Sequence, residues 1–205
     1  MSAPPREPSS LGGLLARTAG FALLTVVLAM AAGILLPASD LVGGAAALGA
    51  AGLLAGWALL HLDGWPADAL GVPLDRRAGW EGAAGWAGGI GVACVAMVGM
   101  AALGGLEWSG DGAEWSLGPW VAEGVRSAVW LAVPAAAEEV LLRGYVLAVA
   151  ARVLGPATAV GVTAVAFGLL HAGNPEVGMM GLLGVTAAGL ALGALVVRTG
   201  SLWAA

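Results

Sequence analysis

The sequence lacks lysine altogether and contains a single cysteine, two histidines and few charges of either sign. Its eight basic residues are all arginines, dispersed along 205 residues. No basic face results, which excludes a nucleic-acid-binding surface and predicts no nucleic-acid partner. One cysteine, Cys94, can form neither a disulfide framework nor a cysteine-based metal site. Cys94 lies in a long apolar run, so we expect a small buried side chain.

What the sequence has instead is apolar residues. They make up 60% of the chain, and charged residues make up 10%, against about 25% in typical soluble proteins. Residues 1–10 are rich in proline and serine and are expected to form a disordered tail. Residues 11–205 are expected to form one transmembrane helical domain. The predicted class is all-α, a polytopic transmembrane helix bundle with membrane lipid around it.

Long apolar runs define the expected spans. A helix needs about 20 mostly apolar residues to cross the hydrocarbon core of a bilayer. About six such runs are present, at 18–36, 41–60, 82–106, 121–151, 157–172 and 177–197. Many are rich in glycine and alanine, which let helices approach closely in lipid. Gly200 is expected to end the last helix.

The arginines favour a cytoplasmic N-terminus. With that orientation, Arg126 is the one arginine flanking the spans that lies on the outer side, which agrees with the positive-inside rule. The cytoplasmic side then holds Arg6, Arg17, Arg76, Arg77, Arg152 and Arg198.

Two adjacent carboxylates, Glu138 and Glu139, stand inside the fourth run. Each costs about 2.5–3.5 kcal/mol at the centre of a membrane helix. Arg143 follows Glu139 by four residues, so the two share a face and can pair. A structural ion pair explains Glu139 and Arg143, but it leaves Glu138, turned by about 100°, without a role. A spare carboxylate can act as a general base that takes a proton from water.

His171 ends the fifth run, four residues after Phe167. The short connection at 154–156 should make the fourth and fifth helices neighbours, which brings His171 toward the carboxylates. The spans place His171 near the outer end of its helix and Glu138 near mid-membrane. The fifth helix must therefore be displaced or tilted, or the spans shifted by a turn. The other histidine, His61, ends the second run and is expected to be an interfacial residue.

These residues resemble the first two motifs of the CAAX-protease and bacteriocin-processing family, intramembrane proteases that include the type II CAAX prenyl endopeptidases. The first is Glu138-Glu139-x-x-x-Arg143 and the second is Phe167-x-x-x-His171. Looser features at 70–77 and 198–203 resemble bacterial members. The protease-like region is 119–205.

The resemblance implies a membrane endopeptidase of the bacterial plasma membrane that cuts a membrane-associated peptide or protein. It implies that Glu138 activates water, His171 assists, and Glu139 and Arg143 support them. Family members have been described as metalloproteases and as glutamate-dependent proteases. If a divalent metal such as zinc binds, Glu138 and His171 are the expected ligands.

One family feature is missing, a third motif with a second histidine. We expect a further span after Ala205 that would carry it. Without it, the chain would be a non-catalytic membrane scaffold or an immunity-type binding protein. A third hypothesis is a proton-coupled transporter that uses Glu138 and His171 as a relay.

Overall fold

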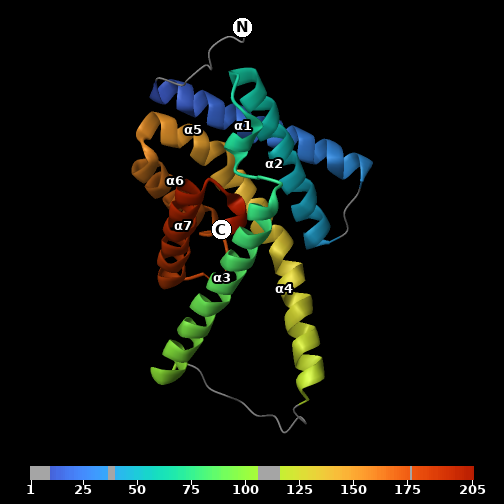
Figure 1. The fold of residues 1–205 in the computed structure, drawn as a ribbon, viewed down its shortest axis with the longest axis vertical. Helices are drawn as coiled ribbons and strands as arrows, with labels where there is room; N and C mark the ends of the chain where they lie inside the picture. Colours follow the sequence, from blue (N-terminus) through green and yellow to red (C-terminus); the bar gives the residue numbers. More distant parts are fainter. Residues whose placement is uncertain (1–9, 37–39, 106–115, 176) are drawn as a thin grey trace.

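The computed structural model describes residues 10–36, 40–105, 116–175 and 177–205, and all regular secondary structure in these ranges is helical. This confirms the predicted all-α class (Figure 1). The elements in chain order are α1 (Leu11–Leu35), α2 (Leu41–Asp63), η1 (Ala67–Leu70), α3 (Arg76–Ala102), α4 (Leu117–Glu139), η2 (Val140–Gly144), α5 (Tyr145–Leu154), α6 (Pro156–Leu170), α7 (Met179–Thr199) and η3 (Leu202–Ala204).

Four of the described helices, α1, α2, α3 and α7, are long and apolar enough to cross a membrane. The shorter apolar helix α6 corresponds to the fifth predicted run. A chain with this many apolar helices has no other way to bury them, and the protein is an integral membrane protein.

The helix ends follow local side-chain chemistry. Ser10 accepts a hydrogen bond from the backbone N–H of Gly13 at the start of α1, and Asp40 does the same for Gly43 at the start of α2. Side-chain caps of this kind satisfy N–H groups that have no partner within the helix. Gly200 ends α7 with φ of 70°, a left-handed conformation that favours glycine. The predicted stop at Gly200 is confirmed.

The fourth predicted run, 121–151, differs most from the prediction. It was expected to be one long span, but the structure divides it into α4, the π-helical segment η2 and α5. Gly144 joins the last two with ψ of −108°, outside the helical region. The chain therefore bends after α4, and α5 runs in a different direction (Figure 1). Periodicity detects the apolar face but not a change of axis.

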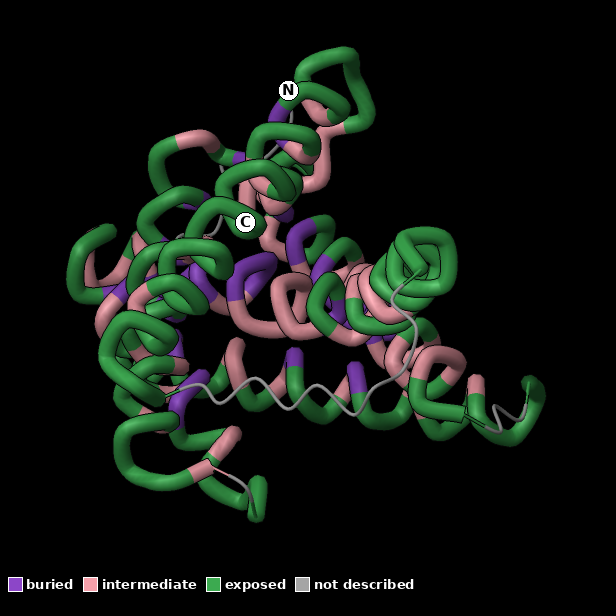
Figure 2. The backbone as a smooth tube through the Cα atoms, turned by 90° about the horizontal axis from the view of Figure 1, so that it is seen from below, coloured by how far each residue is buried: buried purple, intermediate pink, exposed green. Residues whose placement is uncertain are grey.

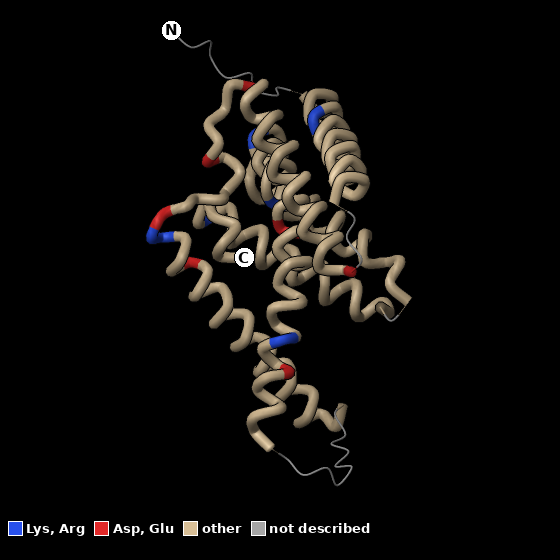
Figure 3. The backbone as a smooth tube through the Cα atoms, turned by 90° about the vertical axis from the view of Figure 1, so that its right-hand side faces the viewer, with Lys and Arg blue, Asp and Glu red and all other residues tan. Residues whose placement is uncertain are grey.

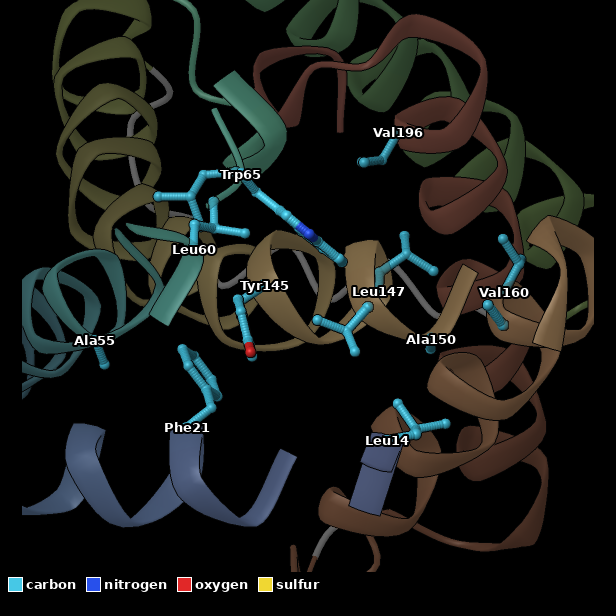
Figure 4. Close-up of a cluster of buried hydrophobic side chains, with 13 residues drawn as sticks. Leu14, Phe21, Ala55, Leu60, Trp65, Tyr145, Leu147, Ala150, Val160 and Val196 are labelled. Carbon is cyan, nitrogen blue, oxygen red and sulfur yellow. The ribbon is translucent and has the colours of Figure 1, made fainter. Parts of the chain in front are cut away.

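The buried core lies where α1, α2, α5, α6 and α7 meet. Leu147, Val149 and Ala150 of α5 are almost completely buried. Figure 4 shows α5 crossing the middle of this cluster, with Phe21 of α1 on one side and Trp65 on the other.

The periphery of the bundle is exposed, most of all along α3 (Figure 2). Beyond its first two turns, α3 has no buried residue. Among the other helices, it packs mainly against η3. Cys94 is exposed on this helix, so the expectation that it is buried was wrong. A lipid-facing helix is as apolar as a buried one, which is why the sequence could not separate the two cases.

Candidate active site

Three glycines on α2 let the end of α4 pack closely against that helix. Gly49, Gly52 and Gly56 are spaced by three and four residues, so they share one face. A Cβ atom at Gly49 would lie 3.1 Å from the Cβ of Ala137, and one at Gly52 would lie 2.9 Å from a methyl carbon of Leu141. The two carboxylates that follow Ala137 are thereby held at a tight helix contact.

The site lies at a break in helical geometry. The α-helix ends at Glu139 and continues as the π-helical segment η2 as far as Gly144. Pro134 lies inside α4, where it removes one backbone hydrogen bond. Single-turn π segments widen a helix by one residue and often occur at functional sites, because they re-aim side chains. Arg143 lies inside this widened turn.

Glu139 and Arg143 form the ion pair expected from their spacing, with Nη1 of Arg143 donating to Oε1 of Glu139. The Arg143 side chain is 2% exposed and that of Glu139 is 12% exposed, so the pair lies in the interior. The second carboxylate oxygen of Glu139, Oε2, is buried and accepts no hydrogen bond from the described residues. A buried acceptor with an unused lone pair can receive a hydrogen bond from water.

Arg143 connects the first motif to the second. The central guanidinium carbon lies 4.7 Å from the centroid of the Phe167 ring, a cation–π geometry. The Phe167 and His171 rings meet edge to face, with centroids 4.6 Å apart. Nδ1 of His171 lies 2.9 Å from the backbone carbonyl oxygen of Phe167. Because a carbonyl oxygen only accepts, Nδ1 carries the proton of the neutral ring, and Nε2 keeps its lone pair.

The second motif packs against the first. Since α5 runs across the bundle, α6 returns to the level of η2, and Phe167 packs on Arg143.

Glu138 is partly buried beside this arrangement. Within the described part of the chain its carboxylate makes no hydrogen bond or ion pair. It is turned by about 100° from Glu139. The two carboxylates therefore differ: Glu139 is paired with Arg143, and Glu138 has no such partner among the described residues.

The described residues do not supply a complete ligand set for zinc. No group of three His, Cys, Asp or Glu residues gathers within them in a way that could hold a metal ion. Catalytic zinc is usually bound by three protein ligands. Glu138 and His171 offer two donors, and Glu139 is committed to Arg143.

A polar network beside the site was missed by sequence reasoning. Arg17 donates two hydrogen bonds to Asp63, from Nε at 2.9 Å and from Nη2 at 2.8 Å. The hydroxyl of Tyr145, the first residue of α5, lies 3.3 Å from Oδ2 of Asp63. The available signal was two opposite charges at the same end of consecutive antiparallel spans. Arg17 was counted only as a topology determinant.

The two looser features of the sequence contact each other. The backbone N–H of Leu202 donates a hydrogen bond to the carbonyl oxygen of Gly71 at 2.6 Å. The indole N–H of Trp203 donates one to the carbonyl oxygen of Pro73 at 2.8 Å. Arg77 donates to the carbonyl oxygen of Thr199 at 3.1 Å. These bonds join the start of α3 to the end of α7.

His61 lies apart from these groups. It is exposed at the end of α2 and stacks on Trp57, with ring centroids 5.8 Å apart.

One comparison with known proteins finds a similarity, and it lies in the C-terminal part of the chain. Residues 120–205 match the family model of Rce1-like type II CAAX prenyl endopeptidases. No curated protein and no solved structure matches the chain. The match covers both motifs, so the part of the chain that carries them is similar to this family of membrane proteases.

Proposed function

We propose that the protein is an intramembrane endopeptidase that hydrolyses a peptide bond in a membrane-associated protein or peptide, with Glu138 as the general base and His171 as its assistant. One observation supports this most directly. The Glu139–Arg143 pair, Phe167 and His171 form a continuous series of contacts. Glu138 stands next to that series with its carboxylate unpaired by the described residues.

In this proposal a water molecule attacks the carbonyl carbon of the scissile bond while Glu138 takes one of its protons. Nε2 of His171 accepts a hydrogen bond from the same water and orients it. The tetrahedral intermediate then breaks its C–N bond, and the proton held by Glu138 passes to the leaving nitrogen. The products are a carboxylic acid and an amine, so the atoms and the protons balance.

Arg143 supports the reaction without touching the substrate. It neutralises Glu139, so the second carboxylate adds no full negative charge beside Glu138. It also packs on Phe167 and so holds His171 in place.

The orientation that we propose has the N-terminus in the cytoplasm. Most arginines lie in the upper half of Figure 3, the half that contains the end of α2.

The test uses the purified protein in liposomes and a quenched fluorescent, farnesylated peptide with a CAAX sequence as the probe. Glu138→Gln should reduce the cleavage rate by about 10²–10⁴-fold, the usual contribution of a general base. Glu123→Gln is the matched control, because Glu123 lies in the same helix in an exposed ion pair with Arg126. His171→Ala should also reduce the rate, and His61→Ala should not. Unchanged cleavage by Glu138→Gln would overturn the proposal, and no cleavage by the unaltered protein would favour the scaffold hypothesis.

A further inference from the structure

The network of Arg17, Asp63 and Tyr145 joins the N-terminal helices to the first residue after the bend. Arg17 lies in the second turn of α1, Asp63 is the last residue of α2, and Tyr145 opens α5. The Arg17 and Asp63 side chains are 22% and 13% exposed, so their ion pair is largely buried. The first two helices and the distant helix α5 therefore meet at one carboxylate.

Asp63 is in an electrostatically unfavourable position for a carboxylate. The C-terminus of a helix carries a partial negative charge, which destabilises an acidic residue there. Two hydrogen bonds from Arg17 and one from the Tyr145 hydroxyl offset this destabilisation of the carboxylate. The role of an acidic residue at this position is therefore to join Arg17 and Tyr145.

Apolar contacts hold the same tyrosine from its other sides. The Tyr145 ring stacks on Phe21 with centroids 5.4 Å apart and an interplanar angle of 24°. A Cβ atom at Gly56 would lie 3.3 Å from the Cβ of Tyr145. Tyr145 itself is 1% exposed. Figure 4 shows the Phe21 and Tyr145 side chains next to each other between α1 and α5.

We propose that the Arg17–Asp63–Tyr145 network fixes the bend that follows Arg143, and that Tyr145 is thereby a positioning residue for the candidate active site. Tyr145 is separated from Arg143 by Gly144 alone, whose backbone leaves the helical region. The direction of α5 at this point decides where α6 returns, and so where His171 lies relative to Glu138. The network thus makes α1 and α2, which lie outside the family match, part of the site.

Spin labels measure the bend directly, without any reference to proteolysis. Val129 on α4 and Leu169 on α6 are exposed, at 65% and 68%, and lie on opposite sides of the bend. Both are replaced by labelled cysteines in a Cys94→Ala background, since Cys94 is exposed. Tyr145→Phe, which keeps the ring and removes the hydroxyl, should shift or broaden the distance distribution. Glu123→Gln should leave it unchanged.

Asp63→Asn is the second variant, and it should broaden the distribution further because it weakens both partners of the network. If Asp63→Asn does not fold, Tyr145→Phe alone decides. A distribution that stays the same in Tyr145→Phe overturns the inference, whether or not the melting temperature falls, because the network would then contribute stability only.

The kinetic measurement rests on the proposed function and is made with the farnesylated probe peptide. Misplacing a reacting group by about 1 Å can lower the rate by about 10²-fold. Tyr145→Phe should therefore lower kcat by about tenfold or more, with KM unchanged. An unchanged kcat, where Glu138→Gln abolishes cleavage, overturns the positioning role. If Glu138→Gln cleaves normally, the proposed function fails, and the spin-label distances still decide whether the network holds the bend.

Discussion

The guanidinium of Arg143 packs against the ring of Phe167, with 4.7 Å from its central carbon to the ring centroid. These residues belong to different motifs, one in η2 and the other in α6. The contact joins the carboxylate half of the candidate site to the histidine half. It also gives Arg143 two partners, the Glu139 carboxylate and an aromatic face.

Phe167→Leu should separate the two halves of the site. The change keeps an apolar side chain but removes both the cation–π contact, which is worth about 0.5–2 kcal/mol, and the edge-to-face contact with His171. We expect kcat for the farnesylated peptide to fall while the protein stays folded. Phe167→Trp keeps an aromatic face and should retain more activity than Phe167→Leu. Equal activity of the two variants would show that the aromatic face has no role.

Arg143→Ala should destabilise the protein strongly. It leaves the buried Glu139 without its partner, and breaking a buried ion pair in this way costs about 3–5 kcal/mol. The quantity to measure is the free energy of unfolding in a titration with sodium dodecyl sulfate. Arg126→Ala is the control, because Arg126 forms an exposed pair with Glu123 that is worth about 0–1 kcal/mol.

The double variant Arg143→Ala, Glu139→Gln tests the cause of that loss. Without a buried charge, it should recover part of the stability that Arg143→Ala loses. If both variants lose the same amount, the unpaired charge is not the reason.

Gly168→Ala should force α6 and α7 apart. An added Cβ atom would lie 2.1 Å from Oγ1 of Thr186, a hydroxyl that is itself bonded to the carbonyl oxygen of Leu182. Overpacking of this kind typically costs about 1–3 kcal/mol. Gly161→Ala, in the same helix, meets nothing within 4 Å and should be neutral or stabilising. Thr186→Ala should rescue Gly168→Ala, and a failure to do so would place the clash elsewhere.

Zinc should not change the melting temperature of this chain. Glu138 and His171 provide two donors, which are too few for tight binding, and a ligand raises stability appreciably only when its concentration exceeds its dissociation constant. We expect the same melting curve with added zinc and with EDTA. A zinc-dependent rise that disappears in His171→Ala would show instead that Glu138 and His171 are metal ligands.

Sequence reasoning located both motifs and paired Glu139 with Arg143, because that pair depends only on helical periodicity within one segment. It also located the four helices that are long and apolar enough to cross a membrane, since each long apolar run must be covered by lipid or protein. It could not foresee the bend at Gly144 or the exposure of Cys94. Both depend on how the helices pack. A helix face that contacts lipid and one that is buried in the core have the same apolar composition, so the sequence does not distinguish them.

The sequence by itself determined that this is an integral membrane protein with Glu138, Glu139 and Arg143 on one apolar run and His171 at the end of the next. The reason is that hydrophobicity and i to i+4 spacing are local properties. Only the tertiary structure decided that α5 turns across the bundle and that Phe167 bridges Arg143 and His171. It also decided that Arg17 and Asp63 meet at Tyr145. These relationships join residues up to 128 positions apart, from 17 to 145, and they arise from the close approach of helices that glycines such as Gly52 and Gly56 permit.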